Sequence, residues 1–260
     1  MGSMTDKVAV VVGASAGLGK AVARRCAAEG AHVVMLARGE ARLLEAAADV
    51  GERAVPLVCD ITQPDSVRTA FAEIERRLGR VDALLQVAGV GRVARIADAT
   101  DDDIQFVMGV NLLGPIYTTR AAVPLLRAAG GGDVVFVSSE IVGDFLPRMV
   151  LYGASKGGLD VFARQMVHEL KPEGIRVSRF TSGSIAGTSF GDNFDPEAIA
   201  AAYPEWMESG YLTRVAGPGM DADSMAEAML FVITRPKGQM IDVIHVRSFA
   251  EGAATVSDAE

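Results

Sequence analysis

Seven short apolar runs, separated by turns and helical patterns, restrict the folds open to this chain. Most are rich in valine and apolar on both faces, which is typical of strands buried in a parallel sheet. Strands are predicted over residues 8–12, 32–36, 55–59, 81–87, 134–138, 176–181 and 240–246. Strands that alternate with helices favour a parallel sheet covered on both faces and joined by right-handed crossovers. We predict one doubly wound α/β domain over residues 7–247, with a sheet of about seven strands.

Helical patterns fill the intervals between the strands. Helices are predicted over residues 17–28, 40–50, 64–79, 101–129 and 152–170. Pro64 suits the first turn of its helix, and Gly79 suits its end. Three aspartates, Asp101 to Asp103, favour a helix start through the helix dipole. Pro124 lies inside the same helix, where a proline is able to cause a kink.

Charge and composition exclude several classes of partner. The net charge of −8 disfavours binding to nucleic acid, and no apolar run approaches the length of a membrane span. Residues 1–6, which begin Met-Gly-Ser-Met, are interpreted as a cloning scar and N-terminus without the apolar core of a signal peptide. Cys26 and Cys59 are too few for a disulfide framework and suit a reducing cytoplasm. The three histidines show no metal-ligand spacing, so no metal site is expected.

A glycine-rich loop follows the first predicted strand and opens the first predicted helix. It reads Gly13-Ala14-Ser15-Ala16-Gly17-Leu18-Gly19. Glycines permit a tight turn and a close approach of the backbone to a pyrophosphate, and the helix N-terminus offers free N–H groups to phosphate. Because these glycines lie between a predicted strand and a predicted helix, they match the phosphate loop of a dinucleotide-binding fold. A bound dinucleotide is therefore predicted.

The residue near the end of the second strand bears on which dinucleotide binds. An acidic residue about 20 positions beyond the loop usually binds the ribose 2′-hydroxyl. This chain has Ala37 there, followed by Arg38. A guanidinium can hold a 2′-phosphate through two hydrogen bonds, whereas a carboxylate would repel it. The sequence therefore predicts NADP(H) over NAD(H), with Arg38 as a solvated surface residue being the alternative.

Further motifs in the same order resemble those of the short-chain dehydrogenases/reductases. They are the glycine loop, with Val12 where the family has Thr, then Asp60-Ile61, Ala88-Gly89, Asn111, Ser138-Ser139, Tyr152-Gly-Ala-Ser-Lys156 and Gly183. The resemblance covers nearly the whole chain from Lys7 to about Val246. It implies a single Rossmann-type domain and a homo-oligomer, tetramer or dimer, with helices 101–129 and 152–170 at its interfaces.

Tyr152 and Lys156 are four residues apart and so share one helix face. Reduction of a carbonyl by hydride needs a proton for the developing alkoxide, and a nearby ammonium favours the phenolate that remains. The resemblance implies that Tyr152 is the proton donor and that Lys156 lowers its pKa and holds the nicotinamide ribose. Ser139, at the end of the fifth predicted strand, would hydrogen-bond the substrate oxygen. Asn111 would support Lys156 through a water molecule.

The resemblance also implies further cofactor contacts. Asp60 and Ile61 would contact the adenine ring, although Asp60 as a plain turn or cap residue is equally open. Ile185 and Thr188 match the loop that covers the nicotinamide amide. The chain departs from the family where it reads Gln86-Val87 before Ala88-Gly89, at Ser182 before Gly183, and in a last strand without a Gly-Gly ending.

Residues 183–219 are irregular and rich in aromatic side chains, and we interpret them as a substrate lid insertion. Their aromatic residues either pack on the core or contact an apolar, bulky carbonyl substrate. Residues 248–260 are interpreted as a C-terminal tail. The function predicted is a cytoplasmic NADP(H)-dependent oxidoreductase acting on a ketone or secondary alcohol. The alternatives are an NAD-dependent alcohol dehydrogenase, a non-catalytic NADP-binding regulator, and a methyltransferase that shares the glycine loop alone.

Overall fold

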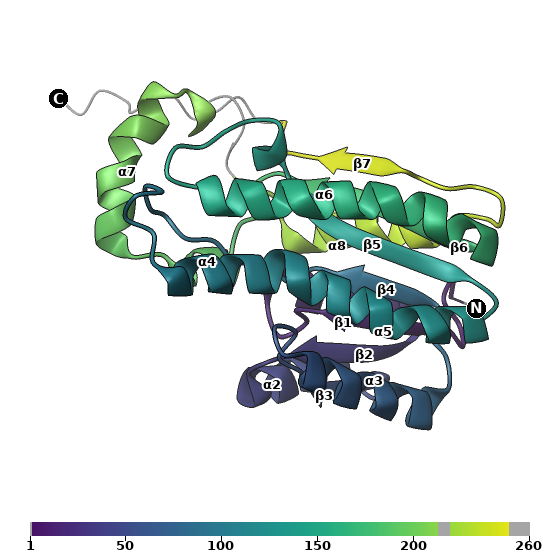
Figure 1. Ribbon diagram of the computed structural model, residues 1–260. Coiled ribbons are helices and arrows are strands. Elements are labelled where there is room, and N and C mark those ends of the chain that lie inside the picture. The colour runs from purple at the N-terminus through teal and green to yellow at the C-terminus, as the bar shows by residue number, and fades with distance from the viewer. Residues whose placement is uncertain (1, 213–218, 250–260) are drawn as a thin grey trace.

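The computed structural model describes residues 2–212 and 219–249. Within them, seven parallel strands form one sheet in the order β3-β2-β1-β4-β5-β6-β7 (Figure 1). The strands are β1 (Val8–Val12), β2 (His32–Ala37), β3 (Ala54–Val58), β4 (Ala83–Gln86), β5 (Gly132–Ser139), β6 (Ile175–Ser182) and β7 (Val243–Val246). The predicted doubly wound parallel sheet is therefore confirmed. The last strand is shorter than predicted, because pairing with β6 begins only at Val243.

Helices cover both faces of this sheet. They are α1 (Gly17–Ala28), α2 (Glu40–Val50), α3 (Pro64–Leu78), α4 (Asp101–Met108), α5 (Gly114–Ala128), α6 (Val150–Leu170), α7 (Pro196–Glu208) and α8 (Ala222–Ile233). Shorter helical segments of the described chain are η1 (Gly109–Leu113), η2 (Glu140–Val142), η3 (Lys171–Glu173) and η4 (Ser189–Asn193). Side chains of α1, α2 and α8 enter one apolar cluster, and those of α3, α5 and α6 enter another.

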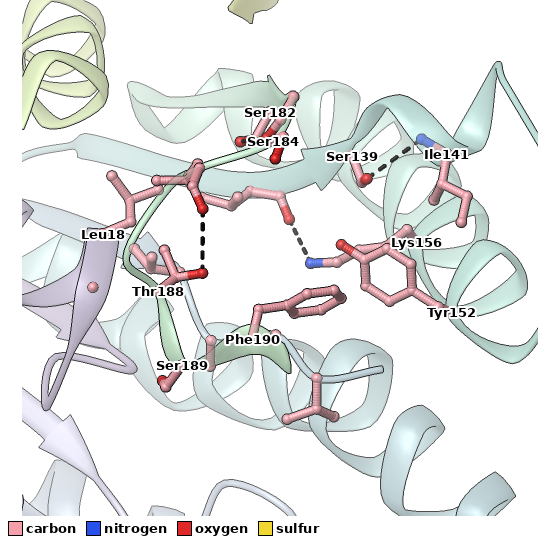
Figure 2. Close-up of a pocket in the computed structure, with 18 of the residues that line it drawn as sticks. Leu18, Ser139, Ile141, Tyr152, Lys156, Ser182, Ser184, Thr188, Ser189 and Phe190 are labelled. Carbon is pink, nitrogen blue, oxygen red and sulfur yellow. Dashed lines mark hydrogen bonds between the residues drawn. The ribbon is translucent and has the colours of Figure 1, made fainter. Parts of the chain in front are cut away.

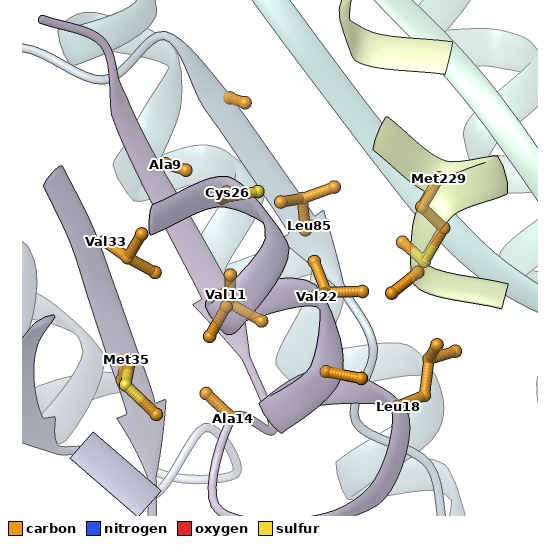
Figure 3. Close-up of a cluster of buried hydrophobic side chains, with 14 of the residues drawn as sticks. Ala9, Val11, Ala14, Leu18, Val22, Cys26, Val33, Met35, Leu85 and Met229 are labelled. Atoms are coloured by element: carbon orange, nitrogen blue, oxygen red, sulfur yellow. The ribbon is translucent and has the colours of Figure 1, made fainter. Parts of the chain in front are cut away.

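The two clusters are separated by the sheet itself. Along β1, Ala9 and Val11 face the first cluster, whereas Val8, Val10 and Val12 face the second. Figure 3 shows the first cluster, with Val11 lying under helix α1. A strand covered on both faces is apolar at every position, which is why valine runs marked the strands in the sequence.

The helix predicted over residues 101–129 is wrong as one continuous element. It is divided into α4 and α5 by the π-helical turn η1, in which the N–H of Gly114 donates to the carbonyl of Gly109. Pro124 lies within α5, and the interruption occurs ten or more residues earlier in the chain, at η1. A π-turn inserts one extra residue into a helix, and such turns are frequent at functional sites.

The segment interpreted as a lid contains η4 and α7, and α7 lies beyond the carboxyl ends of the strands (Figure 1). Residues 213–218 of that segment, residues 250–260 of the predicted tail and Met1 lie outside the described residues. No helix within residues 2–212 and 219–249 is long and apolar enough to cross a membrane.

Phe136→Ala will destabilise the fold by about 3–5 kcal/mol, the range for deleting a buried phenylalanine. Phe136 is 0% exposed on β5 and packs edge-on against Phe162 at 5.7 Å. Phe145→Ala is the matched control, because Phe145 is 79% exposed, and it will change the free energy of unfolding by less than about 0.5 kcal/mol. Urea unfolding of both variants measures the difference, and similar losses in the two would contradict this account of the core.

Candidate active site

The carboxyl ends of β1, β4, β5 and β6 meet at one cavity of about 490 Å³. Parallel strands end at the same edge of a sheet, so loops that are far apart in sequence gather there. The cavity is lined by most of the residues predicted from the sequence: Gly13, Ser15, Gly17, Leu18, Gly19, Ala88, Gly89, Ser139, Tyr152, Lys156, Ile185 and Thr188. The predicted residues Arg38, Asp60, Ile61 and Asn111 are not part of its lining.

The glycine loop forms a cradle that side chains would fill. Gly13 has φ +88°, and a Cβ there would lie 2.8 Å from the Cα of Ala88. A Cβ on Gly19 would lie 2.1 Å from the carbonyl oxygen of Gly13. Helix α1 begins at Gly17, and Ala16 before it provides no side-chain cap for the first N–H groups. Uncapped N–H groups beside a bare backbone are the donors that a pyrophosphate requires, so the loop fits the predicted dinucleotide.

Tyr152 and Lys156 project from α6 into the cavity (Figure 2). Lys156 is 2% exposed, its Nζ donates to the carbonyl of Val137 at 2.7 Å, and it lies 5.9 Å from the centre of the Tyr152 ring. Burial lowers the pKa of Lys156 to about 8, opposed by the charge of Asp160. The Lys156 ammonium is thus held by one carbonyl in a largely apolar wall.

The pKa of Tyr152 reflects its burial. Burial raises it above its ordinary value, and a hydrogen bond with the Ser139 side chain acts in the opposite direction. Lys156 is not among the groups that shift this pKa in the chain by itself. The predicted role of Lys156 in lowering this pKa stays a prediction for the site with cofactor and substrate bound.

Ser139 ends β5, as predicted, and its hydroxyl accepts a hydrogen bond from the N–H of Ile141 at 3.3 Å. That bond turns the chain into η2 and leaves Ser139 beside Tyr152 at the cavity (Figure 2). The next residue, Glu140, is buried and also lines the cavity. Its Oε1 lies 2.9 Å from the Nε2 of His245 in β7. Sequence reasoning missed Glu140, although its position directly after Ser139 was a signal.

Asn111 lies in η1 and connects two parts of the site from behind. Its Oδ1 accepts from the N–H of Val90 at 2.9 Å, and its Nδ2 donates to the carbonyl of Val90 at 2.8 Å and to the Ser155 hydroxyl at 3.0 Å. The π-turn thus aims Asn111 at both the loop after β4 and helix α6. A Cβ on Gly89 in that loop would lie 3.4 Å from the Nζ of Lys156. Asn111 fixes the loop that borders Lys156.

The other residues outside the cavity lining have distinct surroundings. Arg38 follows β2, is exposed, and makes no ion pair with a described residue. Asp60 accepts from the N–H of Thr62 at 3.0 Å and from its hydroxyl at 2.7 Å, which supports its interpretation as a turn residue. Ile61 is buried, and a Cβ on Gly114 would lie 2.7 Å from its side chain.

Two departures from the family pattern have local explanations. Gln86 is buried, and its Nε2 donates to the hydroxyl of Thr118 at 2.6 Å, so it connects β4 to α5. The hydroxyl of Ser182 donates to the carbonyl of Gly183 at 2.8 Å at the start of the loop after β6. Gln86 therefore serves the scaffold around the cavity, whereas Ser182 also lines the cavity.

Aromatic side chains of the lid segment form the opposite wall of the cavity. The ring of Phe190 lies 5.1 Å from that of Tyr152 and 5.2 Å from that of Phe194 (Figure 2 shows Phe190 beside Tyr152). Trp206 and Tyr211 line the same cavity, and burial raises the pKa of Tyr211 to about 12. The sequence left open whether these aromatic residues pack on the core or contact substrate. Phe190, Phe194 and Trp206 pack in one apolar cluster with Tyr152 and also line the cavity, and their contact with substrate stays a prediction.

A doubly wound parallel sheet with a glycine cradle and a Ser-Tyr-Lys group at one edge defines a dinucleotide-binding oxidoreductase fold and site. The family model described as short chain dehydrogenase matches residues 7–198. The 3-oxoacyl-[acyl-carrier-protein] reductase of Bos taurus is 32% identical over 231 residues, which cover 89% of this chain and 92% of that protein. This chain belongs to the short-chain dehydrogenase family and is an oxidoreductase of that family.

Solved structures of similar proteins agree with this assignment. L-sorbose reductase from Gluconobacter frateurii, complexed with NADPH and L-sorbose, is 28% identical, with a TM-score of 0.80 over 95% of this chain and 97% of that chain. The 3-ketoacyl-(acyl-carrier-protein) reductase from Brucella melitensis, complexed with NADH, is 26% identical, with a TM-score of 0.79 over 94% of this chain and 98% of that chain. The two relatives share the fold and differ in the cofactor that they hold.

Replacing Lys156 by Met will remove a pH dependence from the stability of the fold. The native chain releases the Lys156 proton near pH 8, whereas the unfolded chain holds it to about pH 10.5. Between these values the unfolded state binds more protons than the native state, so the free energy of unfolding of wild type increases as the pH rises. Urea unfolding from about pH 7 to about pH 10 should show Lys156→Met losing stability relative to wild type as the pH rises. Parallel pH profiles for the two proteins would contradict the shifted pKa.

Proposed function

We propose that this protein is an NADP(H)-dependent oxidoreductase that interconverts a ketone and a secondary alcohol. One observation carries the proposal: Ser139, Tyr152 and Lys156 line the same cavity as the glycine cradle. A dinucleotide laid on the cradle would be held by Gly13 to Gly19, with Ile185 and Thr188 near its nicotinamide end. The reduced cofactor supplies the hydride, and the residues of the chain orient the substrate and move the proton.

The proton step follows from the two shifted pKa values. Because burial raises the pKa of Tyr152, its phenol keeps its proton at neutral pH and is able to donate it to the carbonyl oxygen. Lys156, with a pKa of about 8, carries its charge at neutral pH and stabilises the phenolate left behind. Ser139 donates a hydrogen bond to the same substrate oxygen, and Asn111 supports the Lys156 side of the cavity.

The substrate and cofactor preferences rest on the cavity walls and on Arg38. The walls contributed by Ile141, Met149, Phe190 and Trp206 suit an apolar, bulky carbonyl compound. The exposed guanidinium of Arg38 after β2, which makes no ion pair with a described residue, suits the 2′-phosphate of NADP(H), with Asp60 and Ile61 toward the adenine. A cytoplasmic homo-oligomer, dimer or tetramer, remains part of the proposal. The second candidate is an NAD-dependent alcohol dehydrogenase, and the relative complexed with NADH supports the NAD part of that candidate.

Tyr152→Phe removes the proton donor and keeps the ring that packs on Phe190. We expect the rate of ketone reduction to fall by at least about 100-fold, the usual scale for loss of a general acid. Binding of NADPH, followed by nicotinamide fluorescence, should stay close to wild type. A panel of aliphatic and aromatic ketones with NADPH provides the assay. Full turnover by the variant would refute the mechanism, and tight NADPH binding without turnover of any ketone by wild type would favour a non-catalytic regulator.

Arg38→Ala tests the cofactor assignment. We expect wild type to bind NADPH more tightly than NADH, and the variant to bind NADPH about tenfold or more weakly with NADH affinity unchanged, because only NADPH loses a charged hydrogen-bond pair. Arg127→Ala is the control, since it removes the same charge from an exposed site at the end of α5. Calorimetric titration measures all six affinities. Equal affinities of wild type for the two cofactors would move the assignment to NAD(H).

A further inference from the structure

Helix α7 is fastened to two loops by one carboxylate. Glu205 of α7 accepts two hydrogen bonds from Arg148, from Nε at 3.1 Å and from Nη2 at 2.7 Å. Its Oε1 also accepts from Nη2 of Arg95 at 2.7 Å. Arg95 belongs to the loop between β4 and α4, and Arg148 to the loop between η2 and α6. We call these three side chains the Glu205 clamp.

Arg148 holds an unusual backbone conformation within this clamp. Its φ is +61°, in the left-handed region that residues other than glycine rarely adopt. Its carbonyl accepts a hydrogen bond from the N–H of Ala94 at 2.9 Å, which joins the two loops directly. A strained backbone conformation persists only where neighbouring groups hold it in place. For Arg148, the hydrogen bonds with Glu205 and Ala94 do so.

The clamp adjoins the wall of the cavity. Trp206, the residue after Glu205, is 8% exposed, and its Nε1 donates to the carbonyl of Pro147 at 2.7 Å. Leu146 and Met149, on either side of Pro147 and Arg148, line the cavity together with Trp206. Glu205 is thus adjacent in sequence to the wall residue Trp206. Its partner Arg148 is adjacent in sequence to the wall residue Met149.

We propose that Glu205 is a positioning residue for substrate: through Arg148 and Arg95 it holds the Leu146, Met149 and Trp206 wall of the cavity in place. The proposal rests on the proposed function for its substrate. Lys156 follows Ser155 in α6, and the Ser155 hydroxyl accepts a hydrogen bond from Asn111, which lies outside the clamp. The two arginines also hold the pKa of Glu205 down to about 2, so the clamp is charged at any ordinary assay pH.

The experiment compares Glu205→Gln with a matched control. Glu73 on α3 is also held by two arginines, Arg76 and Arg77, and its pKa is also lowered to about 2, but it lies away from the cavity. Glu73→Gln therefore removes an equivalent charge and equivalent bonds. Glu205→Asp keeps the charge and should recover part of the wild-type behaviour. Arg148→Gly relieves the positive φ, so any loss in that variant reports the missing guanidinium.

Tryptophan fluorescence measures the wall without any need for turnover. Trp206 is the single tryptophan of the chain. We expect acrylamide quenching of Trp206 to increase, with emission shifted to the red, in Glu205→Gln and Arg148→Gly. Quenching should match wild type in Glu73→Gln and be intermediate in Glu205→Asp. Circular dichroism confirms that each variant is folded. Unchanged quenching in folded Glu205→Gln would overturn the proposal.

Kinetics with 2-octanone and acetophenone as probe ketones test the consequence for substrate. KM in Glu205→Gln should rise about fivefold, the factor that a small network of exposed ion pairs supports, with kcat within about twofold of wild type. A fall in kcat at unchanged KM would overturn the role in positioning substrate. If wild type reduces no ketone, the proposed function fails, and the quenching comparison still decides whether Glu205 holds the wall.

Discussion

The pairing of β1 with β4 is the constraint on which the site depends. These strands are neighbours in the sheet although β2 and β3 come between them in sequence, so the chain winds outward from this pair in both directions. At such a switch point the loops after the two strands separate and leave a crevice. The Cα of Ala88 comes so close to Gly13 that no Cβ fits there. The same contact brings the loop after β4 against the loop after β1 and shapes the glycine cradle.

Several features of the site work against the stability of the fold. Lys156 is buried with a lowered pKa, Glu140 is buried beside Ser139, and Arg148 has a positive φ. Each one costs free energy that an apolar or relaxed residue at the same position would not cost. The valine-rich sheet and its two apolar clusters stabilise the scaffold enough to hold them. Such departures from stable packing, gathered around one cavity, are typical of functional sites.

The sequence predicted the features that are encoded locally. Valine runs marked β1, β2 and β5 because both faces of these strands are covered. The glycine spacing marked the cradle because a Cβ would collide with backbone at Gly13 and Gly19. The π-turn was missed because η1 depends on how Asn111 meets Val90 and Ser155, residues distant in sequence. The burial that raises the pKa of Tyr152 was not predicted, because burial is a tertiary property. Glu205 and Arg148 are 57 positions apart, and no pattern in either segment announces their pairing.

Burial and charge act in opposite directions on the Tyr152–Lys156 pair. Burial favours the neutral phenol of Tyr152 and makes it a weaker acid, so proton donation needs a group that stabilises the phenolate. With burial dominant, Tyr152 keeps its proton, and Lys156 keeps its charge up to a pH of about 8. In the proposed mechanism the Lys156 ammonium supplies that stabilisation as the proton leaves. Under the proposed function, this arrangement delivers a proton to a carbonyl oxygen at neutral pH.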